Sequence, residues 1–162
     1  MRKLALPPLI DPSSRSLILG TMPGERSIAL QQYYGNRGNQ FWKILFAVFN
    51  RPFSNDYSER VRLLKDHRIA LWNVLASCER TGSGDQAIRH AVPNDFGALF
   101  AAHPLIRHVF FESKTAHAWY GRYASFQPHI SYHVLPSTSG LYAGMSLAEK
   151  TLRWQLLADI AR

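Results

Sequence analysis

The chain has 162 residues, about the size at which one domain can bury a core of its own, so we expect residues 1–162 to form a single domain. It carries 19 Lys and Arg against 11 Asp and Glu, a formal net charge of +8, which favours a polyanionic partner such as nucleic acid. Its single cysteine, Cys78, excludes an intrachain disulfide and a thiol-rich metal site.

No stretch approaches the roughly 20 apolar residues of a membrane span, and the start of the chain contains prolines where a signal peptide would need an apolar run. We therefore expect a cytoplasmic protein without membrane contact, associated with the nucleoid if it is bacterial. The seven histidines form no metal-binding signature, so we expect no metal.

Four short runs of β-branched, leucine or aromatic residues predict strands: residues 16–19, 69–74, 108–112 and 131–135. Helical spacing of apolar residues predicts helices over residues 39–49, 57–66, 94–102, 115–123 and 147–160. Asn94 and Ser146 are the expected N-caps of two of them. Strands that alternate with helices predict an α/β fold, a three-layer α/β/α sandwich around a mostly parallel four-stranded sheet.

The first polar loop, Gly20-Thr21-Met22-Pro23-Gly24, directly follows a predicted strand. Its glycines let the backbone turn tightly and approach a ligand. The loop is not a dinucleotide fingerprint, because the third glycine is missing and no clear helix follows at once. Ligands of open α/β sheets bind outside the carboxyl ends of the strands, so this loop is either part of a binding site or an ordinary turn.

The second polar loop gathers aromatic and amide side chains in front of a predicted helix. Tyr34, Asn36 and Arg37 precede Asn39, and the apolar spacing starts at Phe41. A helix-initial asparagine is most often a cap for backbone amides. An amide that donates and accepts can also orient a water or hold a base edge, while an aromatic ring stacks on that base. Both interpretations of Asn39 are open at this point.

The loop after the last predicted strand is small and rich in hydroxyl groups. Ser137, Thr138 and Ser139 can contact phosphates through hydroxyls and backbone amides. Leu141 or Tyr142 can enter a base stack as a wedge. The alternative is a plain hydrophilic crossover to the final helix.

A third loop, residues 77–85, follows the second predicted strand. Cys78 is a weak candidate nucleophile, because the sequence places no His or Asn near it and most lone cysteines are small buried hydrophobic residues. Glu79 and Asp85 can act as paired carboxylates only if the loop brings them together, which the sequence does not determine. An esterase built on Ser137 lacks the Gly-x-Ser-x-Gly elbow.

Four ordered blocks lie at these predicted strand ends: residues 17–27 (LILGTMPGERS), 33–45 (YYGNRGNQFWKIL), 71–75 with 77–80 and 82–83, and 135–139 (LPSTS). Together they resemble the uracil-DNA glycosylase superfamily, and most closely its hypoxanthine-DNA glycosylase (deoxyinosine glycosylase) branch. The resemblance spans nearly the whole chain.

The resemblance implies where the catalytic side chain lies. In uracil-removing members the first loop carries an Asp or Asn that positions the attacking water, whereas that position here is Met22, which cannot orient water. In many uracil enzymes the last loop opens with His or Asn to stabilise the leaving base, whereas this chain has Leu135. The hypoxanthine branch uses an asparagine in the tyrosine-rich segment, and Asn39 matches it. We therefore expect Asn39 to be catalytic.

The resemblance also implies the partner and the reaction. We expect a monomer that needs no cofactor and binds double-stranded DNA containing a deaminated base. It would hydrolyse the N-glycosidic bond of a flipped-out base, hypoxanthine from deoxyinosine, and leave an abasic site. The base-binding candidates are Gly20, Thr21, Met22, Pro23, Tyr34 and Phe41. The DNA-binding candidates are Arg37, Ser137, Thr138, Ser139, Leu141 and Tyr142.

Two alternatives stay open. A mismatch-specific uracil or thymine-DNA glycosylase keeps a similar Asn-x-Phe-Trp segment, here Asn39 to Trp42. A catalytically silent protein that only binds damaged DNA would fit the missing acid of the first loop. Release of hypoxanthine or uracil from DNA distinguishes these possibilities.

Overall fold

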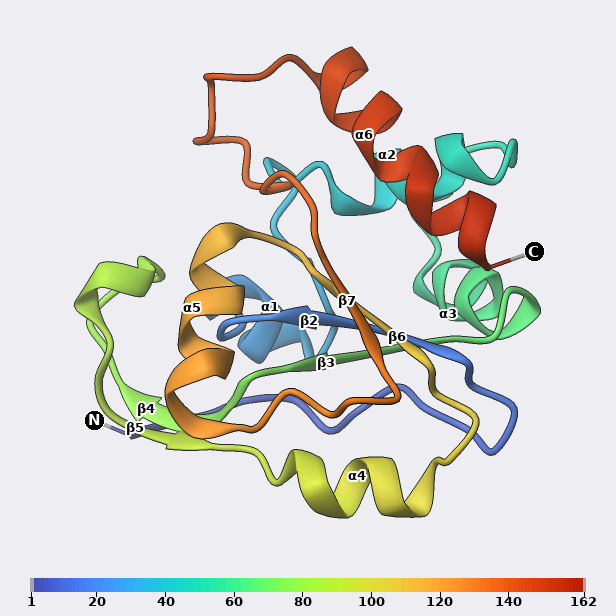
Figure 1. Ribbon diagram of the computed structural model, residues 1–162. Helices are drawn as coiled ribbons and strands as arrows, with labels where there is room; N and C mark the ends of the chain where they lie inside the picture. The colour runs from blue at the N-terminus through green and yellow to red at the C-terminus, as the bar shows by residue number, and fades with distance from the viewer. Residues whose placement is uncertain (1, 162) are drawn as a thin grey trace.

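A computed structural model describes residues 2–161, and at its centre lies a sheet of four parallel strands in the order β3-β2-β6-β7 (Figure 1). The bounds are β2 Ser16–Gly20, β3 Ile69–Asn73, β6 His108–Phe111 and β7 Ser131–Val134. Leu17, Ile18 and Leu19 of β2 are all fully buried, as expected for a strand covered on both faces. The prediction of a four-stranded parallel sheet is confirmed.

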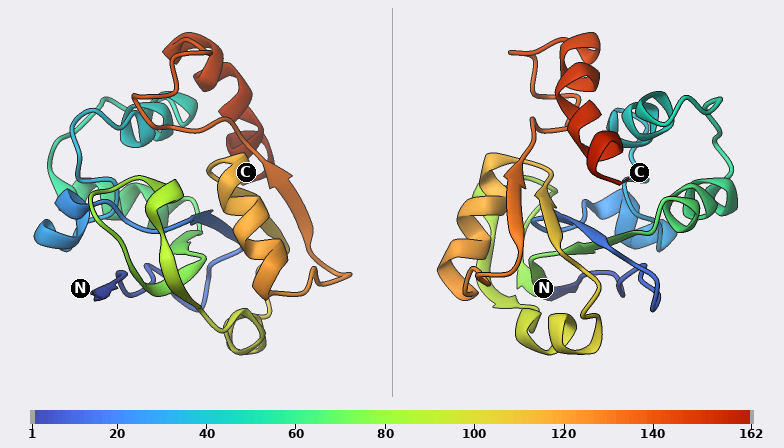
Figure 2. Two further views of the ribbon diagram at one scale, coloured as in Figure 1. Left: turned by 90° about the vertical axis from the view of Figure 1, so that its left-hand side faces the viewer. Right: turned by 45° about the vertical axis from the view of Figure 1, so that its right-hand side comes forward.

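Helices cover both faces of this sheet. Their bounds are α1 Glu25–Leu30, α2 Phe41–Val48, α3 Tyr57–Asp66, α4 Phe96–Ala102, α5 Lys114–Tyr123 and α6 Leu147–Ile160, with a 3₁₀ turn, η1, at Asp85–Ala87. The right-hand view of Figure 2 shows the sheet between α5 on one side and α2 and α3 on the other. The predicted three-layer α/β/α sandwich is therefore confirmed. No helix within residues 2–161 is long and apolar enough to cross a membrane.

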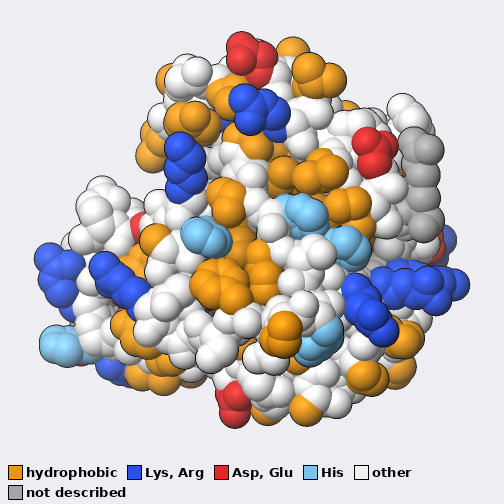
Figure 3. Space-filling view, viewed as in Figure 1, with side chains coloured by type: hydrophobic (Ala, Val, Ile, Leu, Met, Phe, Trp, Pro, Cys, Tyr) orange, Lys and Arg blue, Asp and Glu red, His pale blue; other side chains and the backbone are white. Residues whose placement is uncertain are grey.

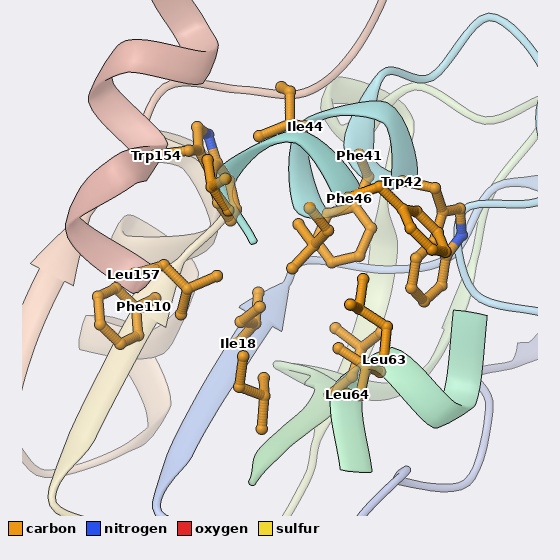
Figure 4. Close-up of a cluster of buried hydrophobic side chains, with 14 of the residues drawn as sticks. Ile18, Phe41, Trp42, Ile44, Phe46, Leu63, Leu64, Phe110, Trp154 and Leu157 are labelled. Carbon is orange, nitrogen blue, oxygen red and sulfur yellow. The ribbon is translucent and has the colours of Figure 1, made fainter. Parts of the chain in front are cut away.

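The alternation of side chains along β2 divides the core into two clusters. Ile18 joins the cluster beneath α2, α3 and α6, which is shown in Figure 4. Leu17 and Leu19 point the other way, into the cluster that α4 and α5 cover. Successive strand residues face opposite sides of a sheet, so one short strand contributes side chains to the core under both helical layers.

A second, three-stranded sheet in the order β1-β4-β5 was not predicted. Its strands are β1 Arg2–Leu4, β4 Leu75–Glu79 and β5 Arg89–Pro93, and both pairings are antiparallel. The prediction that residues 77–85 form a loop is thus wrong for residues 77–79. The sequence Leu-Ala-Ser-Cys-Glu has little intrinsic strand preference, and its pairing with β1 depends on a contact distant in the sequence.

Two local predictions at helix starts are also corrected. The N-cap of α4 is Asp95, whose Oδ1 accepts a backbone N–H at 3.0 Å, whereas Asn94 donates through Nδ2 to the carbonyl of Asn73 at 2.8 Å. The first polar loop is followed by α1, although the sequence shows no clear helix there, because six residues are too few to show a helical period. The predicted cap Ser146 is confirmed, since its Oγ accepts the N–H of Glu149 at 3.1 Å.

Trp154 ties α6 to α2 and to the chain after β7. Its ring is fully buried, its centroid lies 5.9 Å from that of Phe41, and its Nε1 donates to the Pro136 carbonyl at 2.9 Å. We expect Trp154→Ala to lower the free energy of unfolding by about 3–5 kcal/mol, measured by urea denaturation. Leu152→Ala on the same helix is the control, because Leu152 is 77% exposed. Equal losses in the two variants would contradict this account of the core.

Candidate functional site

A cleft of about 1450 Å³ opens at the carboxyl ends of the four parallel strands. Every strand contributes to its lining: Gly20 ends β2, Asn73 ends β3, Glu112 follows β6 and Leu135 follows β7. Figure 3 shows the molecule hollowed on its left side, below the segment that leads to α6. This edge is where open α/β sheets bind ligands.

Most of the site residues predicted from the sequence do line this cleft. They are Gly20, Thr21, Met22, Pro23, Tyr34, Asn39, Ser137, Ser139, Leu141 and Tyr142. Arg37 is exposed on the same loop as Asn39 but is not part of the lining. Arg80 stabilises the first polar loop from the protein interior: its side chain is buried and donates to the Pro23 carbonyl at 2.5 Å.

Two predicted contact residues lie elsewhere. Phe41 is fully buried behind Tyr34, and the two rings stack with centroids 3.9 Å apart. Thr138 is also fully buried, and its backbone N–H and hydroxyl both donate to Glu112, at 3.0 and 3.3 Å. The expected direct contacts of Phe41 with a base and of Thr138 with a phosphate are therefore wrong for this structure. Phe41 supports the ring of Tyr34, and Thr138 positions a carboxyl group.

Three polar side chains converge over Gly20. A Cβ atom at Gly20 would lie 2.9 Å from Tyr34 Oη and 3.2 Å from Asn73 Nδ2. The same point is 3.9 Å from Glu112 Oε1, so only a residue without a side chain leaves this space open. Within residues 2–161, Tyr34 Oη and Asn73 Oδ1 are buried without a hydrogen-bond partner. Such atoms are rare in proteins, and here they point to a ligand with complementary polar groups.

Burial keeps the acids of the cleft protonated at higher pH than usual. It raises the pKa of Glu112 to about 7, against the opposing effect of the Thr138 hydrogen bonds. Burial also raises the pKa of Asp85, a second carboxyl in the cleft lining, while Thr21 and Arg80 oppose that shift. The pKa of Tyr34 lies well above its usual range, first through burial and then through the nearby Glu112. Near neutral pH the cleft can thus donate protons as well as accept them.

The oxygen of the Asn39 side-chain amide is already hydrogen-bonded to the backbone. Asn39 Oδ1 accepts the N–H of Phe41 at 2.8 Å, so the side chain braces the start of α2, although the N-cap position itself is Gln40. The side-chain NH₂ group is then the part of Asn39 that can hold a water or a base. A neutral amide can orient a water but cannot take its proton. The capping and the functional interpretations of Asn39 are therefore compatible.

Lys150 locks two loops of the site together: the Asn39 loop (residues 31–40) and the β7–α6 loop (residues 135–146). It is 1% exposed, and its Nζ donates to Gln40 Oε1 at 2.8 Å and to the Ser139 carbonyl at 3.1 Å. The backbone N–H of Gln40 adds a bond to the Thr138 carbonyl at 2.8 Å. Burial lowers the pKa of Lys150, while Glu112 opposes this shift. The two loops therefore form one unit.

The rim of the cleft combines exposed apolar and cationic side chains. Leu141 is 95% exposed. Tyr142 is only 42% exposed, and its ring centroid lies 5.2 Å from Lys150 Nζ. Lys114 and Arg153, both exposed, also line the cleft. Lys and Arg side chains lie above and below the hollow in Figure 3, as a site for a polyanion requires.

Two further candidates, the nucleophile Cys78 and the acid Glu79, lie outside the cleft lining. Cys78 is fully buried on β4, and burial raises the pKa of its thiol. Glu79 lies on β4 and contacts His90 at 2.6 Å, whereas Asp85 lines the cleft, so the two carboxyls do not share one site. Within residues 2–161, no group of three or more His, Cys, Asp and Glu side chains could hold a metal ion.

Sequence reasoning missed three residues of the site. Asn73 and Glu112 stand at the ends of two predicted strands, and this position alone could have marked them as candidates. Lys150 offered no such signal, because a lysine on a helix is almost always solvated. Lys150 is buried because α6 packs against α2, and this packing can be recognised only in the tertiary structure.

Comparison with known proteins places this chain in a family. The model of the uracil DNA glycosylase superfamily matches residues 7–161, and the chain belongs to that superfamily. A protein named hypoxanthine DNA glycosylase from Methanosarcina acetivorans is 36% identical over 143 residues, which are 86% of this chain and 88% of the relative. Its namesake from Methanosarcina barkeri is 34% identical over the same shares of both chains.

A solved structure agrees with this assignment. The solution NMR structure of a protein from Methanosarcina acetivorans, provisionally named a uracil DNA glycosylase, superposes with a TM-score of 0.79 at 31% identity. The match covers 98% of this chain and 99% of that chain. The fold shown here, including the elements that carry the cleft, is therefore shared with that protein.

The contact between the two loops can be tested at Gly140. A Cβ atom at this position would collide with the Gly38 carbonyl, so Gly140→Ala should push the β7–α6 loop away from the Asn39 loop. We expect the Gln40 amide, which bonds to Thr138, to exchange its hydrogen at least about tenfold faster by NMR, since local opening governs exchange.

Gly97→Ala is the matched control, because a Cβ there meets only Asp95 Oδ1, at 3.5 Å. It should leave the exchange of Gln40 unchanged and stabilise α4 slightly. Unchanged exchange in the Gly140 variant would show that the loops do not depend on this close approach.

Proposed function

We propose that this chain is a monofunctional DNA glycosylase that removes hypoxanthine from deoxyinosine in double-stranded DNA. It acts as a monomer in the cytoplasm and leaves an abasic site. The observation that carries the proposal is the convergence of Tyr34, Asn73 and Glu112 over Gly20, at the floor of a cleft with a cationic rim. Support also comes from the two relatives named hypoxanthine DNA glycosylase.

The shape of the site suits a base that leaves the duplex. A glycosylase extrudes its nucleotide at a cost of a few kcal/mol, which is lowest for mispaired or damaged bases. The net charge of +8 supplies salt-sensitive binding to the phosphates, and Lys114, Arg153, Ser137 and Ser139 line the cleft and are the groups that would contact the strand. Leu141, nearly fully exposed at the rim, is suited to fill the vacated stack.

The chemistry follows from uncharged groups that line the cleft. Asn39 orients a water toward the anomeric carbon, and bond breaking runs ahead of attack through an oxocarbenium-like state, so no strong base is needed at Asn39. Backbone amides of the first polar loop share the charge of the leaving base. The hydrogen bonds of Lys150 to Gln40 and Ser139 hold it in a structural role, which fits hydrolysis without strand cleavage.

Single-turnover release of base from duplexes that carry inosine or uracil tests this proposal. We expect hypoxanthine release from inosine opposite each normal base, and slower or no release of uracil. Preferred uracil release would favour a uracil glycosylase of the same superfamily. Salt-dependent binding with neither base released would indicate a protein that only binds damaged DNA.

Two substitutions separate the roles of Asn39. Asn39→Asp keeps an oxygen for the Phe41 N–H but removes the NH₂ donor, and Asn39→Ala removes both. We expect both variants to slow single-turnover release of hypoxanthine by about 10²-fold or more, and only the alanine variant to lose about 1 kcal/mol of stability. Asn55→Ala, at an exposed asparagine of another loop, is the control. Full activity of Asn39→Ala would refute a catalytic Asn39.

The wedge role of Leu141 predicts a dependence on the DNA strand. Leu141→Ala should slow release from paired inosine by roughly tenfold and leave release from single-stranded inosine unchanged, because only a duplex has a stack to fill. Leu152→Ala, equally apolar and also well exposed, should have no effect on either substrate. Equal losses on both substrates would contradict a wedge.

A further inference from the structure

Glu112 is a carboxyl of the cleft floor to which the steps above give no role in the reaction. It follows β6 and belongs to the cleft lining. Its Oε2 accepts two hydrogen bonds from Thr138, at 3.0 and 3.3 Å. Its Oε1 is the oxygen near the open space over Gly20. A proton on this carboxyl therefore resides on Oε1, because Oε2 already accepts two donors.

The surroundings of Glu112 decide whether it carries that proton. Asp85 of η1 and Tyr34 of the Asn39 loop interact electrostatically with it, and the Asp85 charge disfavours its ionisation. Lys150 of α6 attracts the ionised form, and the Thr138 and Ser137 hydrogen bonds also favour it. Burial outweighs these groups and raises the pKa of Glu112 to about 7. The group is thus poised to give up a proton near neutral pH, as a general acid must be.

We propose that Glu112 is a second catalytic residue, a general acid that protonates a ring nitrogen of the flipped hypoxanthine as its glycosidic bond breaks. The inference rests on the proposed function and adds a leaving-group catalyst to it. Two features of the site leave proton transfer to such a group. Asn39 is a neutral amide that serves the water, and the side chains of Met22 and Leu135 have no polar hydrogen to give to a base.

The bond between C1′ and purine N9 breaks, and both electrons pass to the purine. The proton on Glu112 Oε1 passes to N3 or N7, the two ring nitrogens that carry neither a hydrogen nor the sugar, so hypoxanthine departs neutral and Glu112 is left as a carboxylate. Water adds its oxygen to C1′ and releases a proton, which restores the acid form of Glu112. The net reaction consumes one water.

The assignment also gives the site a chemical preference. A purine offers a basic ring nitrogen away from the scissile bond, whereas uracil, with its N3 protonated, offers only carbonyl oxygens. A carboxylic acid at the floor of the cleft therefore assists a purine more than uracil. Tyr34 and Asn73, whose buried polar atoms lack partners in residues 2–161, remain to bind the other edge of the base.

The main experiment is a pH profile of single-turnover hypoxanthine release from about pH 5 to about pH 9. The protonated form is the active one, so the wild-type rate should be level below the Glu112 pKa of about 7 and fall about tenfold per pH unit above it. Glu112→Gln retains an acceptor for Thr138 but cannot transfer a proton. It should be about 10²-fold slower or worse at low pH and show no such decline.

The control is Glu59→Gln, at an exposed carboxyl of α3 outside the cleft lining, which should keep the wild-type profile. Thermal unfolding verifies that the Glu112→Gln protein is folded before its rates are compared. A folded Glu112→Gln protein with the wild-type rate or the wild-type pH profile would overturn the proposal.

A second measurement asks whether the proton reaches a ring nitrogen. Duplexes with 7-deaza- or 3-deaza-2′-deoxyinosine each lack one acceptor, and on one of them the rate ratio of wild type to Glu112→Gln should fall to about 1, because the proton has no destination. An unchanged ratio on both analogues would overturn general-acid catalysis by Glu112.

Failure of the proposed function can be recognised separately. If the wild-type protein releases no base at any pH, the glycosylase proposal fails, and Glu112 is then tested by binding to duplex containing 2′-fluoro-2′-deoxyinosine, whose glycosidic bond resists cleavage. The donor role predicts affinity that weakens above about pH 7 in the wild type and not in Glu112→Gln. The same pH dependence in both proteins would overturn the role of Glu112 as a proton donor.

Discussion

The parallel pairing of β2 with β3 on one side and β6 on the other is the constraint on which the rest of the structure depends. Gly20 lies opposite Asn73 in this register, and Leu19 lies opposite Phe111, the residue before Glu112. Because the strands run in the same direction and end together, the polar groups that follow them meet at one edge of the sheet. A glycine at the end of the middle strand then leaves room between them. The floor of the cleft is thus a consequence of strand register.

Helix α6 supplies the second requirement, a fixed distance between the two loops above that floor. Trp154 anchors the helix in the core, and Lys150, one turn earlier, bonds to Gln40 and Ser139. Burying a cation costs several kcal/mol unless it is well hydrogen-bonded, so these bonds offset a cost that a solvated lysine would not incur. In return, these bonds fix the positions of the two loops relative to each other. Asn39, which orients the water in the proposed reaction, and Leu141, the proposed wedge, lie on two loops that hydrogen bonds connect.

The electrostatic properties of the protein surface differ from those of the cleft floor. The surface is strongly basic, which suits a long, sequence-independent contact with phosphates. At the floor, burial keeps Glu112 and Tyr34 protonated to higher pH than usual, and Asp85 shifts in the same direction. A base that has left the duplex therefore passes from a cationic rim to a floor whose acids hold their protons to higher pH than usual. Such a floor can read the edges of a base and, in the proposed reaction, supply a proton to it.

The sequence by itself determined the four strands of the main sheet, the long helices and the loops that form the cleft, because these follow from local periodicity and from turn residues at strand ends. Membership of the superfamily could likewise be predicted from four short blocks. Tertiary structure alone decided that Phe41 and Thr138 lie behind the site, that β1, β4 and β5 form a second sheet, and that Lys150 is buried. It also decided the raised pKa of Glu112. Each of these depends on contacts between residues far apart in the chain, and burial, which sets both packing and pKa, does not exist until those contacts form.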